Sequence, residues 1–176
     1  MKKNKIISVF LVFLLSFPCH FLYNFFPNFI FASLFPVNES IWEHMKIIYT
    51  SLLITSVIEY IIIIKKNLNV SNYLFNYSIT GILAIIIYLI MYLPLEIIFG
   101  HSFILAIILL FITYVISEII NCYLMNFNSI KNSLKYGFII IIITYFIFTL
   151  FTYFPPKLTL FRDPTNNNYG ILKEDN

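Results

Sequence analysis

The sequence predicts an all-α fold, a polytopic membrane helix bundle of about five transmembrane helices. Of its 176 residues, 60% are hydrophobic and only 11% are charged, whereas a soluble domain carries roughly 25% charged residues. The same composition excludes a disordered chain, because a chain this apolar does not remain solvated. The apolar runs at residues 82–93 and 138–148 are continuous and lack the alternation that the strands of a membrane β-barrel need.

Five apolar stretches are long enough to cross a bilayer, which takes about 20 residues per helix. They predict spans at residues 6–23, 39–64, 73–93, 101–123 and 136–154. The chain then divides into a transmembrane bundle over residues 1–154 and a C-terminal tail over residues 155–176. The lipid bilayer is the one partner that this organisation predicts.

The ends of the spans follow from charge and proline. Lys5 and two earlier lysines precede the first span as in a signal peptide, but no small-x-small cleavage site follows, so we expect an uncleaved helix. The linker 24–36 is apolar and contains two prolines, which favours a segment at the interface or re-entering the bilayer. Lys65 closes the second span, and Pro94 is expected to break the third after Leu93.

The orientation follows from the placement of Lys and Arg, which are more frequent in cytoplasmic loops. With the N-terminus inside, the cytoplasmic segments hold seven of these residues: Lys2, Lys3, Lys5, Lys65, Lys66, Lys131 and Lys135. The outer segments hold four: Lys46, Lys157, Arg162 and Lys173. The count favours a multi-pass protein of the bacterial plasma membrane with a cytoplasmic N-terminus and an extracytoplasmic C-terminus. No basic patch interleaves with exposed aromatic residues, so nucleic-acid binding is not expected.

Polar residues from four distant segments collect at the outer side in this topology. They form a candidate polar pocket: Asn38, Glu39, Trp42, Glu43, His44, Glu96, His101, Arg162 and Asp163. Carboxylate and imidazole are ligands for Zn²⁺ or another divalent metal ion, and the candidate metal ligands are Glu43, His44, Glu96 and His101. The two histidines would be ligands or transfer protons, the two glutamates would be ligands or bases, and Arg162 would bind an anionic group or pair with a carboxylate.

A purely structural interpretation accounts for part of this group. Ser40 and Glu43 have the spacing of a capping box, with Asn38 as the alternative N-cap. Lys46 could pair with Glu43 one turn away, and a tryptophan at position 42 would be an interfacial anchor. His20, at the end of the first span, is expected to be interfacial only.

Two further carboxylates, Glu59 and Glu118, lie near the cytoplasmic ends of their spans. They either snorkel toward the lysines of the cytoplasmic loops or belong to a proton or cation relay. Glu39 and Glu59 are roughly 30 Å apart along a helix, and no carboxylate lies between them. The structural interpretation is therefore favoured.

Two motifs carry a resemblance to a known family. Residues 36–44 read PVNESIWEH, and residues 160–164 read LFRDP. They resemble an uncharacterised family of small bacterial integral-membrane proteins of clostridial type. The resemblance supports the topology and the choice of candidate residues, and it implies no activity.

Three functions remain open from the residues. A metal-dependent membrane hydrolase acting on lipid or peptide would need His44 and His101. A small transporter would also need a polar route across the bilayer, so Glu59 and Glu118 would matter as much as the polar residues of the outer side. In an accessory membrane protein, the polar residues would only cap and dock helices.

Overall fold

The computed structural model describes residues 2–67 and 71–171, and the side chains of the first helix from Lys5 onward. Lys173 of the predicted tail lies outside the described residues. The described chain contains helices and no strand; an isolated antiparallel bridge joins Arg162 and Tyr169. The elements are α1 (Lys2–Phe25), α2 (Phe29–Leu34), α3 (Ile41–Lys65), α4 (Tyr73–Phe99), α5 (Phe103–Leu124), α6 (Ser133–Tyr153) and the short 3₁₀ helix η1 (Thr159–Phe161).

Five of these helices, α1, α3, α4, α5 and α6, are long and apolar enough to cross a membrane. The all-α class and the number of spans are thus confirmed. The end of α4 differs from the prediction, because the helix continues through Pro94 to Phe99. Proline is tolerated inside membrane helices, where the backbone finds other partners. The helix ends at Phe99, and Gly100 is its C-cap. Gly100 has a positive φ of 73°, and its N–H donates a hydrogen bond to the Glu96 carbonyl.

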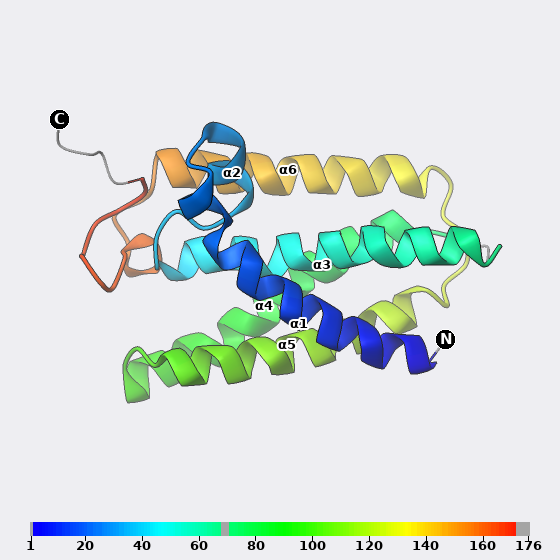
Figure 1. Cartoon of the computed structure of the whole chain (residues 1–176), viewed down its shortest axis with the longest axis horizontal. Helices are drawn as coiled ribbons and strands as arrows, with labels where there is room; N and C mark the ends of the chain where they lie inside the picture. The colour runs from blue at the N-terminus through cyan, green and yellow to red at the C-terminus, as the bar shows by residue number, and fades with distance from the viewer. Residues whose placement is uncertain (1, 68–70, 172–176) are drawn as a thin grey trace.

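The helices form a bundle around α3, which packs against α1 and α4 (Figure 1). Helix α4 also contacts α5 and α6, and α1 contacts α5. The N-terminal end of α1 and the segment 154–171 lie at opposite ends of the bundle (Figure 1), as an odd number of spans requires. We call the end that carries residues 154–171 the tail end.

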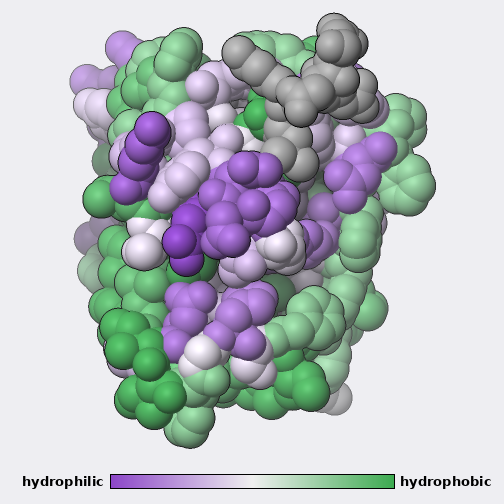
Figure 2. Space-filling view, turned by 90° about the vertical axis from the view of Figure 1, so that its left-hand side faces the viewer, coloured by the Kyte–Doolittle hydropathy of each residue, from purple (hydrophilic) through white to green (hydrophobic). Residues whose placement is uncertain are grey.

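The tail end is covered by residues 155–171, which pack on the start of α3. The Trp42 ring lies 4.8 Å from the ring of Phe161 and 5.2 Å from that of Phe151. Asn38 Nδ2 donates to the Gly170 carbonyl at 2.8 Å. Figure 2 shows this end of the molecule, with hydrophilic residues at its centre and apolar side chains around them. The tail is therefore a docked part of the fold.

Candidate functional site

The start of α3 positions the side chains of the candidate site. Ser40 is the N-cap, and its Oγ accepts the Glu43 N–H at 3.4 Å, as predicted. The Glu43 carboxylate does not return to Ser40, whose own N–H donates to Asn38 Oδ1 at 2.9 Å. It accepts the Val37 N–H at 3.0 Å instead. Half of the predicted capping box is therefore present.

Glu43 belongs to a buried ion pair with Lys46, at 2.6 Å between Oε2 and Nζ. Lys46 Nζ also donates to the Ala32 carbonyl at 2.6 Å, and Thr152 Oγ1 donates to Glu43 Oε1 at 2.8 Å. The pair thus ties α2 and α6 to α3. Because both side chains are buried and their polar atoms are occupied, Glu43 serves the packing of the tail end and is not free to bind a metal ion.

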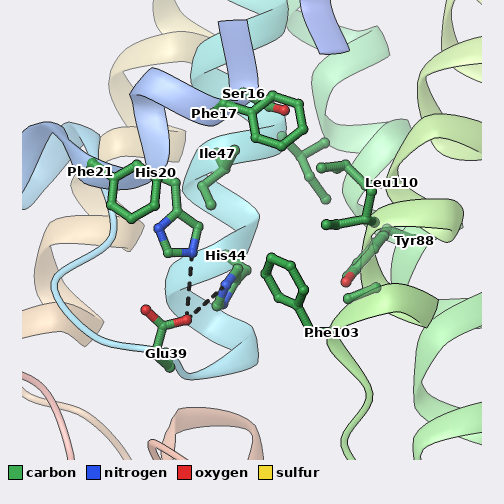
Figure 3. Close-up of a pocket in the computed structure, with 13 residues that line it drawn as sticks. Ser16, Phe17, His20, Phe21, Glu39, His44, Ile47, Tyr88, Phe103 and Leu110 are labelled. Atoms are coloured by element: carbon green, nitrogen blue, oxygen red, sulfur yellow. Dashed lines mark ion pairs between the residues drawn. The ribbon is translucent and has the colours of Figure 1, made fainter. Parts of the chain in front are cut away.

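Three other side chains meet at the surface of α1 and α3: His20, Glu39 and His44 (Figure 3). Glu39 Oε2 lies 3.5 Å from His20 Nε2 and 3.4 Å from His44 Nε2. One ligand atom from each residue can be chosen so that all three lie within 4.8 Å of one another. We call these residues the His–Glu–His cluster.

The spacing of the His–Glu–His cluster fits a metal ion. Two ligands about 2.1 Å from a tetrahedral Zn²⁺ are separated by about 3.4 Å, which matches both nitrogen–oxygen distances. His44 Nδ1 donates to the Ser40 carbonyl at 2.8 Å, so that in the neutral imidazole Nε2 carries the lone pair. Without a metal ion, hydrogen bonds donated by His20 and then by His44 lower the pKa of Glu39 below its usual value, although partial burial opposes this. A bound ion would take the place of the donated protons. The carboxylate is therefore ionised, as a ligand must be.

An apolar cavity of about 310 Å³ adjoins the cluster. Its walls come from α1, α3, α4 and α5, and the His–Glu–His cluster forms one end of it (Figure 3). Phe17, Ile47, Phe103 and Leu110 are among the apolar lining residues, and Tyr88 reaches the cavity from α4. The cluster therefore faces the apolar cavity, and a few polar groups in an otherwise apolar cavity are common in binding sites.

The other predicted site residues lie elsewhere at the tail end. Glu96 and His101 form a local pair across the α4–α5 connection, at 3.8 Å between Oε1 and Nδ1. Tyr92 Oη lies 3.2 Å from His101 Nδ1. Within the described chain, no hydrogen bond or ion pair joins this pair to the His–Glu–His cluster. The expected ligand set of Glu43, His44, Glu96 and His101 is therefore not assembled: among the described residues, the group whose ligand atoms lie within 4.8 Å of one another contains His44 but none of the other three.

The predicted tail residues dock the tail. Asp163 is buried and accepts the N–H groups of Glu39 at 3.3 Å and Thr165 at 2.8 Å. Arg162 is exposed and pairs through its backbone with Tyr169. Asp163 thus fixes the backbone of a cluster residue, while Arg162 lies outside the cluster.

His20 is the cluster residue that sequence reasoning assigned to the interface alone. No local signal marks it, because it lies 24 positions before His44 and reaches the cluster from another helix. Its ring centroid lies 5.1 Å from that of His44 and 4.7 Å from that of Phe21. The sequence indicates only that His20 and Glu39 lie at the same predicted membrane depth.

At the opposite end, the cation that meets Glu59 and Glu118 is Lys5. Its Nζ lies 3.2 Å from Glu59 Oε2 and 2.9 Å from Glu118 Oε2, and it donates to Tyr77 Oη at 3.0 Å. Tyr77 and Ser8 also donate to Glu59. The predicted snorkelling toward the loop lysines is therefore wrong: α1 brings its own lysine to both carboxylates.

Comparison with known proteins places the whole bundle in one family. The model of DUF6512, a family of unknown function, matches residues 1–171, and the chain belongs to this family. No curated protein and no solved structure matches the chain.

Proposed function

We propose that the His–Glu–His cluster binds a divalent metal ion and that the protein is a metal-dependent membrane hydrolase. The observation that carries the proposal is the convergence of two imidazole nitrogens and one carboxylate oxygen at ligand spacing. Three protein ligands leave a coordination position open, which is typical of catalytic and not of structural zinc sites. That open position would face the apolar cavity.

The residues of the cluster suit hydrolysis. A Zn²⁺ ion held there would acidify a coordinated water and polarise the carbonyl or phosphoryl oxygen of a substrate. Glu39 would balance part of the charge of such an ion, and the hydrogen bond from His44 Nδ1 to the Ser40 carbonyl would hold the ring in a ligating orientation. The apolar walls of the cavity would keep bulk water from the reacting bond.

The opposite end of the bundle favours a hydrolase over a transporter. A transporter would need Glu59 and Glu118 to exchange their bound cation or proton. Both carboxylates already meet Lys5, a cation that belongs to the chain itself. These carboxylates therefore stabilise the docking of α1.

The predicted orientation places the site on the outside of the cell. We propose that the N-terminus is cytoplasmic in a bacterial plasma membrane, so that the tail end and the cluster face the exterior. A reporter enzyme fused after Asn176 should then be active outside the cytoplasm. Activity in the cytoplasm would refute this orientation.

Metal content tests the proposed site directly. The protein is purified in detergent without chelators, and its metal content is measured by inductively coupled plasma mass spectrometry. Four forms are compared: wild type, His20→Ala, His44→Ala and, as the control, His101→Ala. We expect about one divalent ion per wild-type chain, lost in the first two variants and retained in the third. Gel filtration confirms that each variant is folded. A metal-free wild type, or loss of the ion only in His101→Ala, would refute the ligand assignment.

A further inference from the structure

We propose that the apolar cavity binds one hydrocarbon chain of a membrane phospholipid, which enters from the bilayer between α1 and α5. The inference deepens the proposed function, because it names the substrate class whose polar linkage the His–Glu–His cluster would hold. The binding of the chain itself depends on the cavity alone.

The first support is the composition of the cavity walls. Apart from the cluster, they are almost entirely aliphatic and aromatic, with hydroxyl groups at Ser16 and Tyr88 only. The Ser16 hydroxyl already donates to the Phe13 carbonyl at 2.6 Å. A peptide would bring amide groups that find few partners here, whereas a hydrocarbon chain needs none. The walls therefore favour a lipid over a peptide.

The second support is the depth of the cavity. Its lining on α5 runs from Phe103 to Leu110, which corresponds to about 10 Å along the helix axis. That distance is about one third of the hydrocarbon thickness of a bilayer. Both α1 and α5 are long and apolar enough to cross a membrane. In a bundle that spans the bilayer, the cavity would therefore lie at the depth of lipid tails near the tail end. Its polar end, the His–Glu–His cluster, lies where a lipid linkage region would be.

The third support is the side on which the cavity opens. Phe17 and Phe21 of α1 line the cavity and are exposed, and Phe103 of α5 is 69% exposed. Deeper in the bundle the two helices meet, with the rings of Phe13 and Phe111 5.2 Å apart. Toward the tail end α1 crosses α3 diagonally and leaves α5 (Figure 1). The opening therefore lies between two membrane-facing helices and toward the surrounding lipid.

Two buried residues make the proposal testable. Ile47 and Ile48 line the cavity, yet their side chains are only 3% and 1% exposed. Lipids around the bundle do not reach them, but a chain inside the cavity does. Ile108 on α5 is exposed and does not line the cavity, so it reports contact with surrounding lipid.

The experiment uses wild-type protein reconstituted in phosphatidylcholine vesicles with a phosphatidylcholine probe that carries a diazirine in one acyl chain. After illumination, labelled peptides are located by mass spectrometry. In the wild type we expect labelling of Ile108 and of at least one of the two cavity residues, Ile47 and Ile48. Labelling at Ile108 alone would overturn the proposal. A diazirine-bearing fatty acid serves as a second probe, and labelling of Ile47 or Ile48 by it but not by the phospholipid would also overturn the proposal.

Cavity-filling variants give the matched control. Ala106 lines the cavity, and Ala106→Phe should lower labelling at Ile47 and Ile48 roughly tenfold while labelling at Ile108 is unchanged. Ala106→Leu is the milder variant if the larger ring prevents folding, and Ile108→Phe on the lipid face should leave labelling inside the cavity unchanged. Undiminished labelling at Ile47 and Ile48 in folded Ala106 variants would overturn the proposal.

The metal and lipid proposals can fail separately. Labelling at Ile47 and Ile48 in a wild type without bound metal would refute the hydrolase and leave the lipid site intact. One bound metal ion without labelling at these residues would refute the lipid site and leave the metal centre intact.

Discussion

The buried pair of Lys46 and Glu43 provides the sharpest test of how the tail end is held together. Lys46 is 0% exposed, and its Nζ contacts Glu43 Oε2 and the Ala32 carbonyl, each at 2.6 Å. Lys46→Met removes the cation and leaves the Glu43 carboxylate buried with two neutral donors. Removing one partner of a buried ion pair costs about 3–5 kcal/mol of unfolding free energy.

The expected effect is large enough to measure by thermal unfolding. For chains of this size each kcal/mol lowers Tm by about 2–4 °C, so Lys46→Met should lower Tm by roughly 6–20 °C. Trp42, the one tryptophan of the sequence, packs against Phe148, Phe151 and Phe161 beside this pair. Its fluorescence is therefore a built-in reporter of the unfolding of the tail end.

Two further variants separate the ion pair from general damage. Glu43→Gln combined with Lys46→Met removes both charges and should recover part of the lost Tm, because no unpaired charge remains. Lys66→Met changes an exposed lysine and should alter the unfolding free energy by less than about 0.5 kcal/mol. A Tm for Lys46→Met equal to that of Lys66→Met would refute the reasoning, as would a double variant less stable than Lys46→Met.

Three further outcomes follow from the other polar groups. Lys5→Met should lower the free energy of unfolding by about 3–5 kcal/mol, because it leaves two carboxylates without their cation. Lys5→Met combined with Glu118→Gln should recover part of this loss. Equal Tm values for Lys5→Met and wild type would contradict the ionic docking of α1. Asp163→Ala removes the acceptor of the Glu39 and Thr165 N–H groups, so protease should cleave residues 155–171 faster than in Arg162→Ala, as followed by mass spectrometry. In metal-free protein the pKa of Glu39 is lower in the folded chain than in the unfolded chain. The ionised carboxylate therefore stabilises the fold above about pH 4.3, the ordinary pKa of a glutamate. This stabilisation is lost as the pH falls through the folded-state pKa. Infrared titration should show this carboxylate still ionised near pH 4, and His20→Ala with His44→Ala should return its pKa toward the ordinary value; an unchanged titration would refute the assignment.

The sequence by itself determined the class of the fold and the number of spans. A bilayer leaves the backbone no partner except its own helix, so continuous apolar runs of sufficient length become helices whatever their packing. Local chemistry was equally readable at Ser40, which caps α3, and at Lys46, which pairs with Glu43 one turn away. The prediction that Pro94 ends the third span is wrong, because proline breaks helices in water but is tolerated inside a membrane helix, where other groups satisfy the freed backbone.

The tertiary structure alone decided which polar groups meet. His20 and His44 share Glu39 only because α1 crosses α3 at the tail end, and Lys5 reaches Glu59 and Glu118 because the same helix begins between α3 and α5. Depth in the membrane can be estimated from sequence, since it depends on counting residues along a span. The rotation and neighbours of each helix depend on packing of side chains that are apolar on nearly every face, and such a sequence carries little signal for them.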